Sequence, residues 1–243
     1  MILVLLLGGI GRRFRDAGYT CPKHQLPMPD GTPLLRHVLT SYFPFPAKVL
    51  VPLLMSYQTS DVMGLFPSWT EFYPLMQESP SPLHTILTTT SLSHALRVSR
   101  DAILIADCDS FLDAAECARG VRRMSYYATA GSFIQASTNG GAAYVQVDAA
   151  GYAQEIWEKD LFTTTSITGP YWWANAKSCW EDLTHGLMTG LTSIAPCLNH
   201  RIAMQPRSVW CTPTKTFQHL GTPQAYETYL AQHGRLVRRG ASL

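Results

Sequence analysis

Residues 2–14 read ILVLLLGGIGRRF, and this stretch decides how the rest of the chain is interpreted. Residues 2–7 are continuously apolar, too few to span a bilayer, and end at glycines, which is typical of a fully buried strand in a parallel sheet. Gly8, Gly9 and Gly11 follow, and they allow backbone N–H groups to approach an anion without interference from a Cβ atom. The stretch therefore predicts a phosphate-binding loop at the carboxyl end of a buried strand.

The residues after this loop add positive charge and exclude two commoner phosphate motifs. Arg12 and Arg13 carry fixed charges that suit phosphate oxygens. A P-loop would have Lys-Ser or Lys-Thr at this place, and a dinucleotide-binding fingerprint would have glycines spaced G-x-G-x-x-G; neither pattern is present. The features that do follow are the pair Pro22-Lys23 and residues 31–35, GTPLL, where a proline suits the first turn of a helix.

Apolar runs alternate with helix-like segments over the first 125 residues. Strands are predicted at residues 2–7, 49–53, 72–76 and 103–106, with helices from residue 33 and at residues 61–65 and 83–96. After residue 124 the strands become shorter and more alternating, at residues 133–136, 142–147 and 153–157, and we interpret them as hairpins; helices follow at residues 177–186 and 223–232. We predict one α/β domain over residues 1–243, with a Rossmann-like, mostly parallel central sheet flanked by helices and an antiparallel edge lobe.

Length and composition narrow the class of protein further. A chain of 243 residues with 46% hydrophobic residues can bury a substantial core. The formal net charge is +2 and no long basic run occurs, so nothing indicates a nucleic acid as partner. The N-terminal apolar run precedes its arginines, unlike a signal peptide, and no other run is long enough for a membrane span, so we expect a cytoplasmic protein. The six cysteines form no C-x-x-C pair, which argues against a zinc site or a disulfide framework.

The loop and the motifs that follow it resemble the signature of the nucleotidyltransferase family, the sugar-1-phosphate and phosphocholine-type pyrophosphorylases. That signature comprises a first strand, a G-x-G-x-R-hydrophobic loop, a Pro-Lys pair and a G-x-P-hydrophobic helix start. Here it is carried by Gly9, Gly11, Arg13, Phe14, Pro22, Lys23, Gly31, Pro33 and Leu34. The intervening Gly18-Tyr19 resembles the branch that acts in surface-polysaccharide and phospho-alcohol activation. Where the family usually has Ser or Thr, this chain has Arg12.

The resemblance implies an enzyme that joins the NMP part of an NTP (CTP, UTP or dTTP) to a phosphorylated sugar or small phospho-alcohol and releases pyrophosphate, for surface-polysaccharide or related glycan synthesis. Residues 1–125 would form the nucleotide-binding half, and residues 126–243 would form the acceptor-binding half. The resemblance is also compatible with a homo-oligomer. Arg13, Lys23 and Lys159 are the expected catalytic residues, because the transfer requires cations on phosphate oxygens. The expected nucleotide-binding residues are Leu7, Gly8, Gly9, Gly11, Arg12, Arg13, Lys23 and Ser81.

The same resemblance implies a metal site. Asp109 follows a buried strand in ILIADCDSF and resembles the family's strand-end metal ligand. Asp107 lies two positions earlier, and because alternate side chains of an extended chain point the same way, it is expected to support the same ion. Residues 217–223, FQHLGTP, resemble a closing motif whose aspartate is the second ligand, but this chain has His219 there. The expected cofactor is Mg²⁺ or Mn²⁺, of which Mn²⁺ accepts imidazole more readily; His219 is alternatively a phosphate contact.

The acceptor side is predicted from two further segments. Glu158-Lys159 ends a strand and resembles the family's Glu-Lys pair, in which the lysine meets the acceptor phosphate. Residues 168–173, TGPYWW, resemble a glycine-aromatic strand that lines the acceptor pocket, so Gly169 and Tyr171 are expected to bind the acceptor together with Lys159. The two tryptophans in this segment suit either the pocket wall or the core. Residues 78–85 stand where the family recognises the base, and their Pro-rich form leaves the base open.

Two other functions are compatible with the sequence. A glycosyltransferase that uses nucleotide sugars would hold a metal ion jointly with Asp107 and Asp109, but this function does not explain the glycine loop and Pro22-Lys23. A homologue that binds a nucleotide without turnover is suggested by Arg12 and His219, which both depart from the family pattern.

Overall fold

A computed structural model describes residues 1–42, 48–136, 143–158 and 163–240, with side chains up to residue 234. Its core is a mixed sheet with the strand order β10-β6-β9-β4-β1-β2-β3. These strands are β1 (Ile2–Leu6), β2 (Lys48–Leu54), β3 (Thr70–Leu75), β4 (Ile103–Asp107), β6 (Ala130–Ala136), β9 (Thr165–Trp173) and β10 (Val209–Pro213). All of them run in one direction except β9, which is antiparallel to both of its neighbours, β4 and β6.

Helices cover both faces of this sheet, and successive side chains of β1 point alternately to one face and to the other. Leu3 and Leu5 belong to a core with α2 (Leu34–Tyr42) and α6 (Ala114–Tyr127). Ile2 and Val4 belong to a second core on the opposite face, with α4 (Pro82–Thr88), α5 (Thr90–Val98) and α7 (Ala176–Met188). Because both faces are covered, β1 is apolar at every position, as its sequence predicts.

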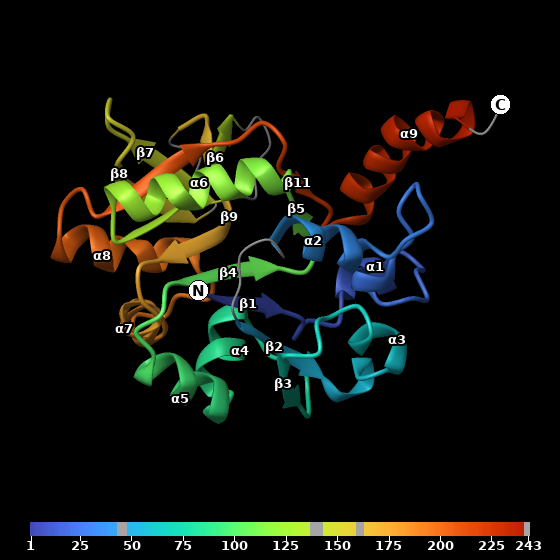
Figure 1. Ribbon diagram of the computed structural model, residues 1–243, viewed down its shortest axis with the longest axis horizontal. Helices are drawn as coiled ribbons and strands as arrows, with labels where there is room; N and C mark the ends of the chain where they lie inside the picture. Colours follow the sequence, from blue (N-terminus) through green and yellow to red (C-terminus); the bar gives the residue numbers. More distant parts are fainter. Residues whose placement is uncertain (43–47, 137–142, 159–162, 241–243) are drawn as a thin grey trace.

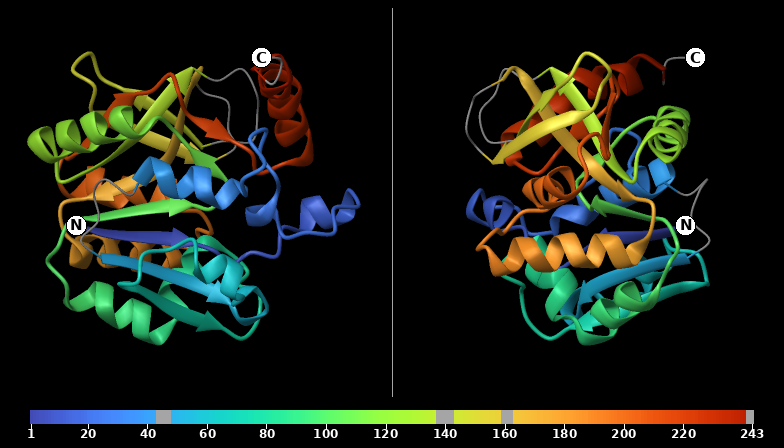
Figure 2. Two further views of the ribbon diagram at one scale, coloured as in Figure 1. Left: turned by 45° about the vertical axis from the view of Figure 1, so that its right-hand side comes forward. Right: turned by 90° about the vertical axis from the view of Figure 1, so that its left-hand side faces the viewer.

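The remaining elements lie around the sheet. A hairpin of β7 (Ala143–Val147) and β8 (Ala153–Glu158) is attached to β9. The short strands β5 (Ser110–Phe111) and β11 (Gln218–His219) form an antiparallel ribbon at the end of the sheet where α1 (Arg12–Asp16) begins (Figure 1). The other elements are η1 (Lys23–Gln25), η2 (Met55–Tyr57), α3 (Ser60–Met63), η3 (Ala195–Cys197), α8 (Leu198–Met204) and α9 (Pro223–Gly240). The C-terminal half of α9 extends away from the sheet (Figures 1 and 2).

The predicted class is confirmed: the protein is α/β, with a largely parallel central sheet, flanking helices and an antiparallel part. One continuous sheet runs through both predicted halves, because β9 joins β4 to β6. The prediction that residues 133–136 belong to an edge hairpin is wrong, since β6 pairs with β9 and β10 inside the sheet. The hairpin prediction for the next two strands is confirmed by β7 and β8.

The single helix predicted over residues 83–96 is two helices, with a break at Thr89, whose backbone is extended (φ −74°, ψ 94°). The hydroxyls of Thr88 and Thr89 donate to the carbonyls of His84 and Thr85, at 2.7 and 2.6 Å. Hydroxyls that bond back in this way compete with the helical backbone and bend or end a helix. A run of threonines therefore explains the break.

All six cysteines are free thiols, and all but Cys21 are buried. Among the described residues, no helix combines the length and the apolar character that crossing a bilayer requires.

Candidate functional site

The glycine loop packs tightly at the carboxyl end of β1. Leu7 is buried and forms a parallel bridge with Leu53 of β2. A Cβ atom at Gly8 would lie 3.0 Å from the side chain of Thr85 in α4, and Gly11 has a left-handed backbone with φ 65°. Both positions therefore require glycine, one for close approach and the other for its conformation.

Gly9 and the two arginines face outward from the loop. Gly9 is exposed, and a Cβ there would meet no atom within 4 Å, so the space beside it is open to a ligand. Arg12 and Arg13 begin α1, and the Arg12 guanidinium lies 3.4 Å from the Glu78 carboxylate, which follows β3. That pair is largely exposed. Arg13 is exposed and its side chain forms no ion pair with any described residue, so its charge remains available to an anion.

Lys23 reaches from beside the loop to the metal-ligand candidate Asp109. Its Nζ lies 2.6 Å from Oδ2 of Asp109, and the two side chains are only 20% and 7% exposed. A Cβ at Gly11 would lie 3.3 Å from Cβ of Lys23, so the lysine stem packs directly against the loop. Burial opposes the charge of Lys23, but the Asp109 carboxylate outweighs it and raises the pKa of the ammonium. Burial would likewise raise the pKa of Asp109, yet Lys23 and His219 lower it.

His219 is brought to the same carboxylate by the ribbon of β5 and β11, in which it pairs with Ser110. The Ser110 hydroxyl lies 2.9 Å from Nδ1 of His219, which is itself 3.8 Å from Oδ1 of Asp109. This contact turns the other ring nitrogen toward Gly221. The position that a Cβ would occupy on Gly221 is 2.5 Å from Nε2 of His219 and 2.7 Å from Oδ2 of Asp109. A Cβ would collide with both groups, so glycine at this position allows one imidazole nitrogen and one carboxylate oxygen to converge over the backbone.

The carboxylate of Asp107 lies beside β9. Its Oδ2 lies 3.6 Å from the position that a Cβ would take on Gly169 in β9, and the ring of Tyr171 lies at the same distance from that position. The nearest glycines of the two carboxylates differ, Gly169 for Asp107 and Gly221 for Asp109, although Asp107 is still close enough to Asp109, Lys23 and His219 to interact with their charges. Burial and the neighbouring Asp109 raise the pKa of Asp107 to about 6, against the opposing effects of Lys23 and His219.

An aromatic cluster anchors α1 to the last helix. Phe14, Tyr19 and Tyr226 meet edge to face, with ring centroids 5.3 to 6.1 Å apart. The Tyr19 hydroxyl donates to the Glu227 carboxylate at 2.9 Å, and the Tyr226 hydroxyl donates to the carbonyl of Pro27. The first turns of α9 therefore hold the segment that follows the glycine loop.

The other predicted residues have varied positions. Ser81 caps α4 by accepting a hydrogen bond from the N–H of His84 at 3.2 Å, so its role in the structure is helix capping. Glu158 is the last residue of β8, whereas Lys159 lies outside the described residues. Trp172 and Trp173 are both buried and belong to the two cores, which settles their assignment in favour of packing.

A buried polar network connects β9 to the helices packed against it. Asp182 of α7 is fully buried, and its carboxylate accepts hydrogen bonds from Nε1 of Trp173 at 2.9 Å and Nε of Arg201 at 3.0 Å. Nδ1 of His200 lies 2.7 Å from its other oxygen. The network ties β9 to α7 and α8.

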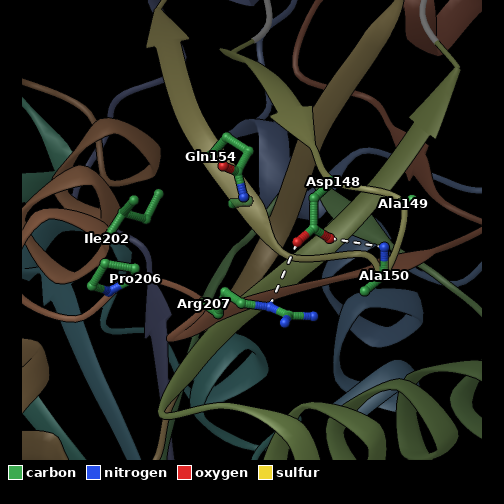
Figure 3. Close-up of a pocket in the computed structure, with 8 residues that line it drawn as sticks. Asp148, Ala149, Ala150, Gln154, Ile202, Pro206 and Arg207 are labelled. Carbon is green, nitrogen blue, oxygen red and sulfur yellow. Dashed lines mark hydrogen bonds and ion pairs between the residues drawn. The ribbon is translucent and has the colours of Figure 1, made fainter.

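A cavity of about 430 Å³ lies away from these residues (Figure 3). It is bounded by the turn between β7 and β8 and by the segment between α8 and β10, and its polar lining includes Asp148, Gln154 and Arg207. The Arg207 guanidinium is 3.7 Å from Asp148 and 4.6 Å from the ring centre of Tyr152, so its charge already interacts with protein groups. None of the predicted site residues lines this cavity.

Three residues of the site were missed by sequence reasoning. Thr85 lies beneath Gly8, Ser110 orients His219, and Gly221 allows His219 and Asp109 to approach its backbone closely. Gly221 could have been found, because it belongs to the motif that points to His219. Thr85 and Ser110 carry no signal in the sequence, since their roles depend on segments far apart in the chain.

Comparisons with known proteins identify the fold. No family model matches the sequence, and no curated protein matches it. The structure is similar to a nucleoside-diphosphate-sugar pyrophosphorylase from Vibrio cholerae RC9, with a TM-score of 0.80 and 18% identity over 96% of this chain and 100% of that chain. It is also similar to a UTP-bound UGPase from Acinetobacter baumannii (TM-score 0.74, 13% identity, 98% and 97% covered) and to the inositol-1-phosphate CTP transferase from T. maritima (TM-score 0.70, 13% identity, 100% and 98% covered). The chain therefore has the nucleotidyltransferase fold.

Proposed function

We propose that this protein is a nucleotidyltransferase that joins the NMP part of an NTP to a phosphorylated small-molecule acceptor. An oxygen of the acceptor phosphate attacks the α-phosphorus, a new P–O bond forms, the bond to the bridging oxygen breaks, and pyrophosphate leaves with the electron pair. One observation carries the proposal: Lys23, Asp109 and His219, from three distant parts of the chain, meet beside the glycine loop at the carboxyl end of the sheet. Ligands of open α/β sheets bind at that end.

The chain's cations have distinct roles in this reaction. The glycine loop offers open space at Gly9 for a phosphate, and Arg13 supplies a charge that no described residue neutralises. Lys23 is already held in a nearly buried position, where a charge interacts more strongly with phosphate than it would in water. We propose that Lys23 leaves Asp109 for the phosphates when the nucleotide binds, which exchanges one anionic partner for another.

We propose that Asp109 and His219 hold a divalent ion, Mg²⁺ or Mn²⁺. The convergence of Nε2 of His219 and Oδ2 of Asp109 over Gly221 supports this assignment. Among the described residues, no group of three or more His, Cys, Asp or Glu side chains is arranged to hold a metal by itself. That fits an ion that takes one or two protein ligands and completes its shell with water and phosphate oxygens. When bound, the ion would neutralise negative charge on the phosphates.

The finer assignments rest on resemblance to proteins of known activity. Similar structures include a nucleoside-diphosphate-sugar pyrophosphorylase and an inositol-1-phosphate CTP transferase, which supports a phosphorylated sugar or polyol as acceptor. A role in surface-polysaccharide or related glycan synthesis is proposed from the resemblance of Gly18-Tyr19 to that branch of the family. A cytoplasmic location is proposed because the N-terminal apolar run precedes its arginines, unlike a signal peptide. Lys159 is proposed as the acceptor-phosphate contact because it follows Glu158 at the end of β8.

The test is pyrophosphate release by the purified protein with CTP, UTP, dTTP and ATP, each combined with glucose 1-phosphate, inositol 1-phosphate or phosphocholine, in Mg²⁺ or Mn²⁺. We expect release with at least one pair and none without an acceptor. An Asp109→Ala variant provides the inactive control. Binding of nucleotide without release in any combination would favour a homologue that binds without turnover, and transfer from a nucleotide sugar to a sugar acceptor would favour a glycosyltransferase.

A further inference from the structure

Asp107 differs from Asp109 in having no hydrogen-bond or ion-pair partner among the described residues. Asp109 is paired with Lys23, whereas the carboxylate of half-buried Asp107 forms no hydrogen bond or ion pair with any group in the described part of the chain. A half-buried carboxylate without a partner loses part of its hydration and gains nothing in return. Such a group is a candidate for contact with a ligand.

The position of Asp107 is on the acceptor side of the sheet. It ends β4, and the pairing of Ile105 with Tyr171 places Asp107 level with Gly169 on β9. The position of a Cβ on Gly169 has only two atoms within 4 Å, Oδ2 of Asp107 and Cε2 of Tyr171, each at 3.6 Å. A ligand group lying over Gly169 would therefore meet a carboxylate and a phenol together.

The chemistry of these two side chains favours a hydroxyl group as their ligand. An ionised carboxylate only accepts hydrogen bonds, while a protonated phenol both donates and accepts. Burial and the negative charge of Asp107 raise the pKa of Tyr171, so the phenol keeps its proton. A quaternary ammonium group would instead require several aromatic faces around it, and the neighbouring Trp172 and Trp173 are buried in the cores.

We propose that Asp107 and Tyr171 bind a hydroxyl group of the acceptor over Gly169, so that the acceptor is a phosphorylated sugar or polyol and Asp107 determines specificity instead of holding the metal. This inference rests on the proposed nucleotidyl transfer. It divides the two aspartates between the two substrates: Asp109 faces Lys23 and His219, and Asp107 faces β9.

The first experiment separates this inference from the proposed function. Pyrophosphate release by the wild-type protein is compared for glucose 1-phosphate, inositol 1-phosphate and phosphocholine. Release with any of them supports nucleotidyl transfer, and we expect it with the hydroxyl-bearing acceptors and not with phosphocholine. A preference for phosphocholine would overturn the hydroxyl assignment and leave the proposed function intact.

The second experiment uses Asp107→Asn, which keeps the shape of the side chain. We expect the KM for the preferred hydroxyl-bearing acceptor to rise about 10-fold or more, since a hydrogen bond to a charged group is lost, while the KM for the nucleotide stays within about twofold. Manganese affinity, measured by calorimetry without substrates, should stay unchanged in Asp107→Asn and fall in Asp109→Asn. A fall in both would make Asp107 a metal ligand and refute the inference.

Gly169→Ala fills the proposed hydroxyl position at ordinary contact distance, without a left-handed backbone to strain. It should weaken acceptor use, whereas Gly234→Ala, at a glycine that also has open space around it, provides the matched control. If the wild type turns over no tested pair, calorimetric binding of glucose 1-phosphate and inositol 1-phosphate replaces turnover. Failure of both to bind, or equal binding to wild type and Asp107→Asn, would also refute the inference.

Discussion

The pair formed by Lys23 and Asp109 supports a prediction about stability. In Lys23→Met the apolar stem keeps its packing against Gly11, but Asp109 is left 7% exposed without its main partner. Removal of one member of a buried ion pair typically costs 3 to 5 kcal/mol. Since Lys23 is one-fifth exposed and His219 still lies 3.8 Å from the carboxylate, we expect about 3 kcal/mol in the free energy of unfolding.

The assay is urea unfolding at pH 7, with Lys48→Met as the matched control. Lys48 forms an ion pair of similar length, 2.8 Å, with Glu71, but both side chains are more than 40% exposed. Pairs of that kind contribute about 0 to 1 kcal/mol, so the control variant should unfold close to the wild type.

The dependence on pH follows from the direction of the shifts. The pKa of Asp109 is lowered in the folded protein from an ordinary value of 3.8, so its stabilising effect is complete above pH 4 and is lost as the pH falls further. In Lys23→Met that benefit is absent. The difference in stability between wild type and variant should therefore be largest near pH 7 and shrink toward pH 3. Equal losses for Lys23→Met and Lys48→Met, or a difference that does not change with pH, would refute the reasoning.

Three other substitutions give direct tests. Arg13→Ala should lower turnover about 100-fold or more, because the charge of Arg13 is free to meet phosphate. Arg12→Ala loses only an exposed ion pair and should have a smaller effect. Steady-state kinetics that show the reverse order would contradict this prediction. His219→Asp should shift metal preference from Mn²⁺ toward Mg²⁺ in titrations of activity, and an unchanged preference would remove His219 from the metal site. Asp182→Asn should lower the free energy of unfolding by about 3 kcal/mol, measured in urea, since it leaves the Arg201 charge unpaired in the interior; a change below 1 kcal/mol would argue against the network.

Sequence reasoning was sufficient for features that depend on short segments. The buried strand β1, the loop at its end and the placement of Asp109 at the same edge of the sheet follow from local patterns and from the geometry of parallel sheets, whereas Lys23 was found through the family resemblance. The α/β class follows from the alternation of elements. These signals are contained in a few neighbouring residues.

Features that depend on distant contacts were not predictable. Helix α6 was not predicted. A Cβ at Gly120 would clash with the Phe133 ring, so this glycine is explained by packing against β6, a contact that the sequence does not show. The contact between Ser110 and His219 joins residues 109 positions apart. The contact of Asp107 with β9 joins two segments more than 60 residues apart, which the alternation rule does not describe.

The aromatic cluster that anchors the glycine loop has a consequence for biosynthesis. Phe14 and Tyr19 leave the ribosome early, but the partner of the Tyr19 hydroxyl, Glu227, is synthesised 208 residues later. Until then α1 lacks the support of α9, and His219 has not yet reached Asp109. The candidate site is thus among the last parts of the molecule to be completed during translation, although its first residues are made at the start. Premature termination before α9, or proteolysis in its first turns, would remove the contacts of Tyr226 and Glu227 that hold the segment after the glycine loop.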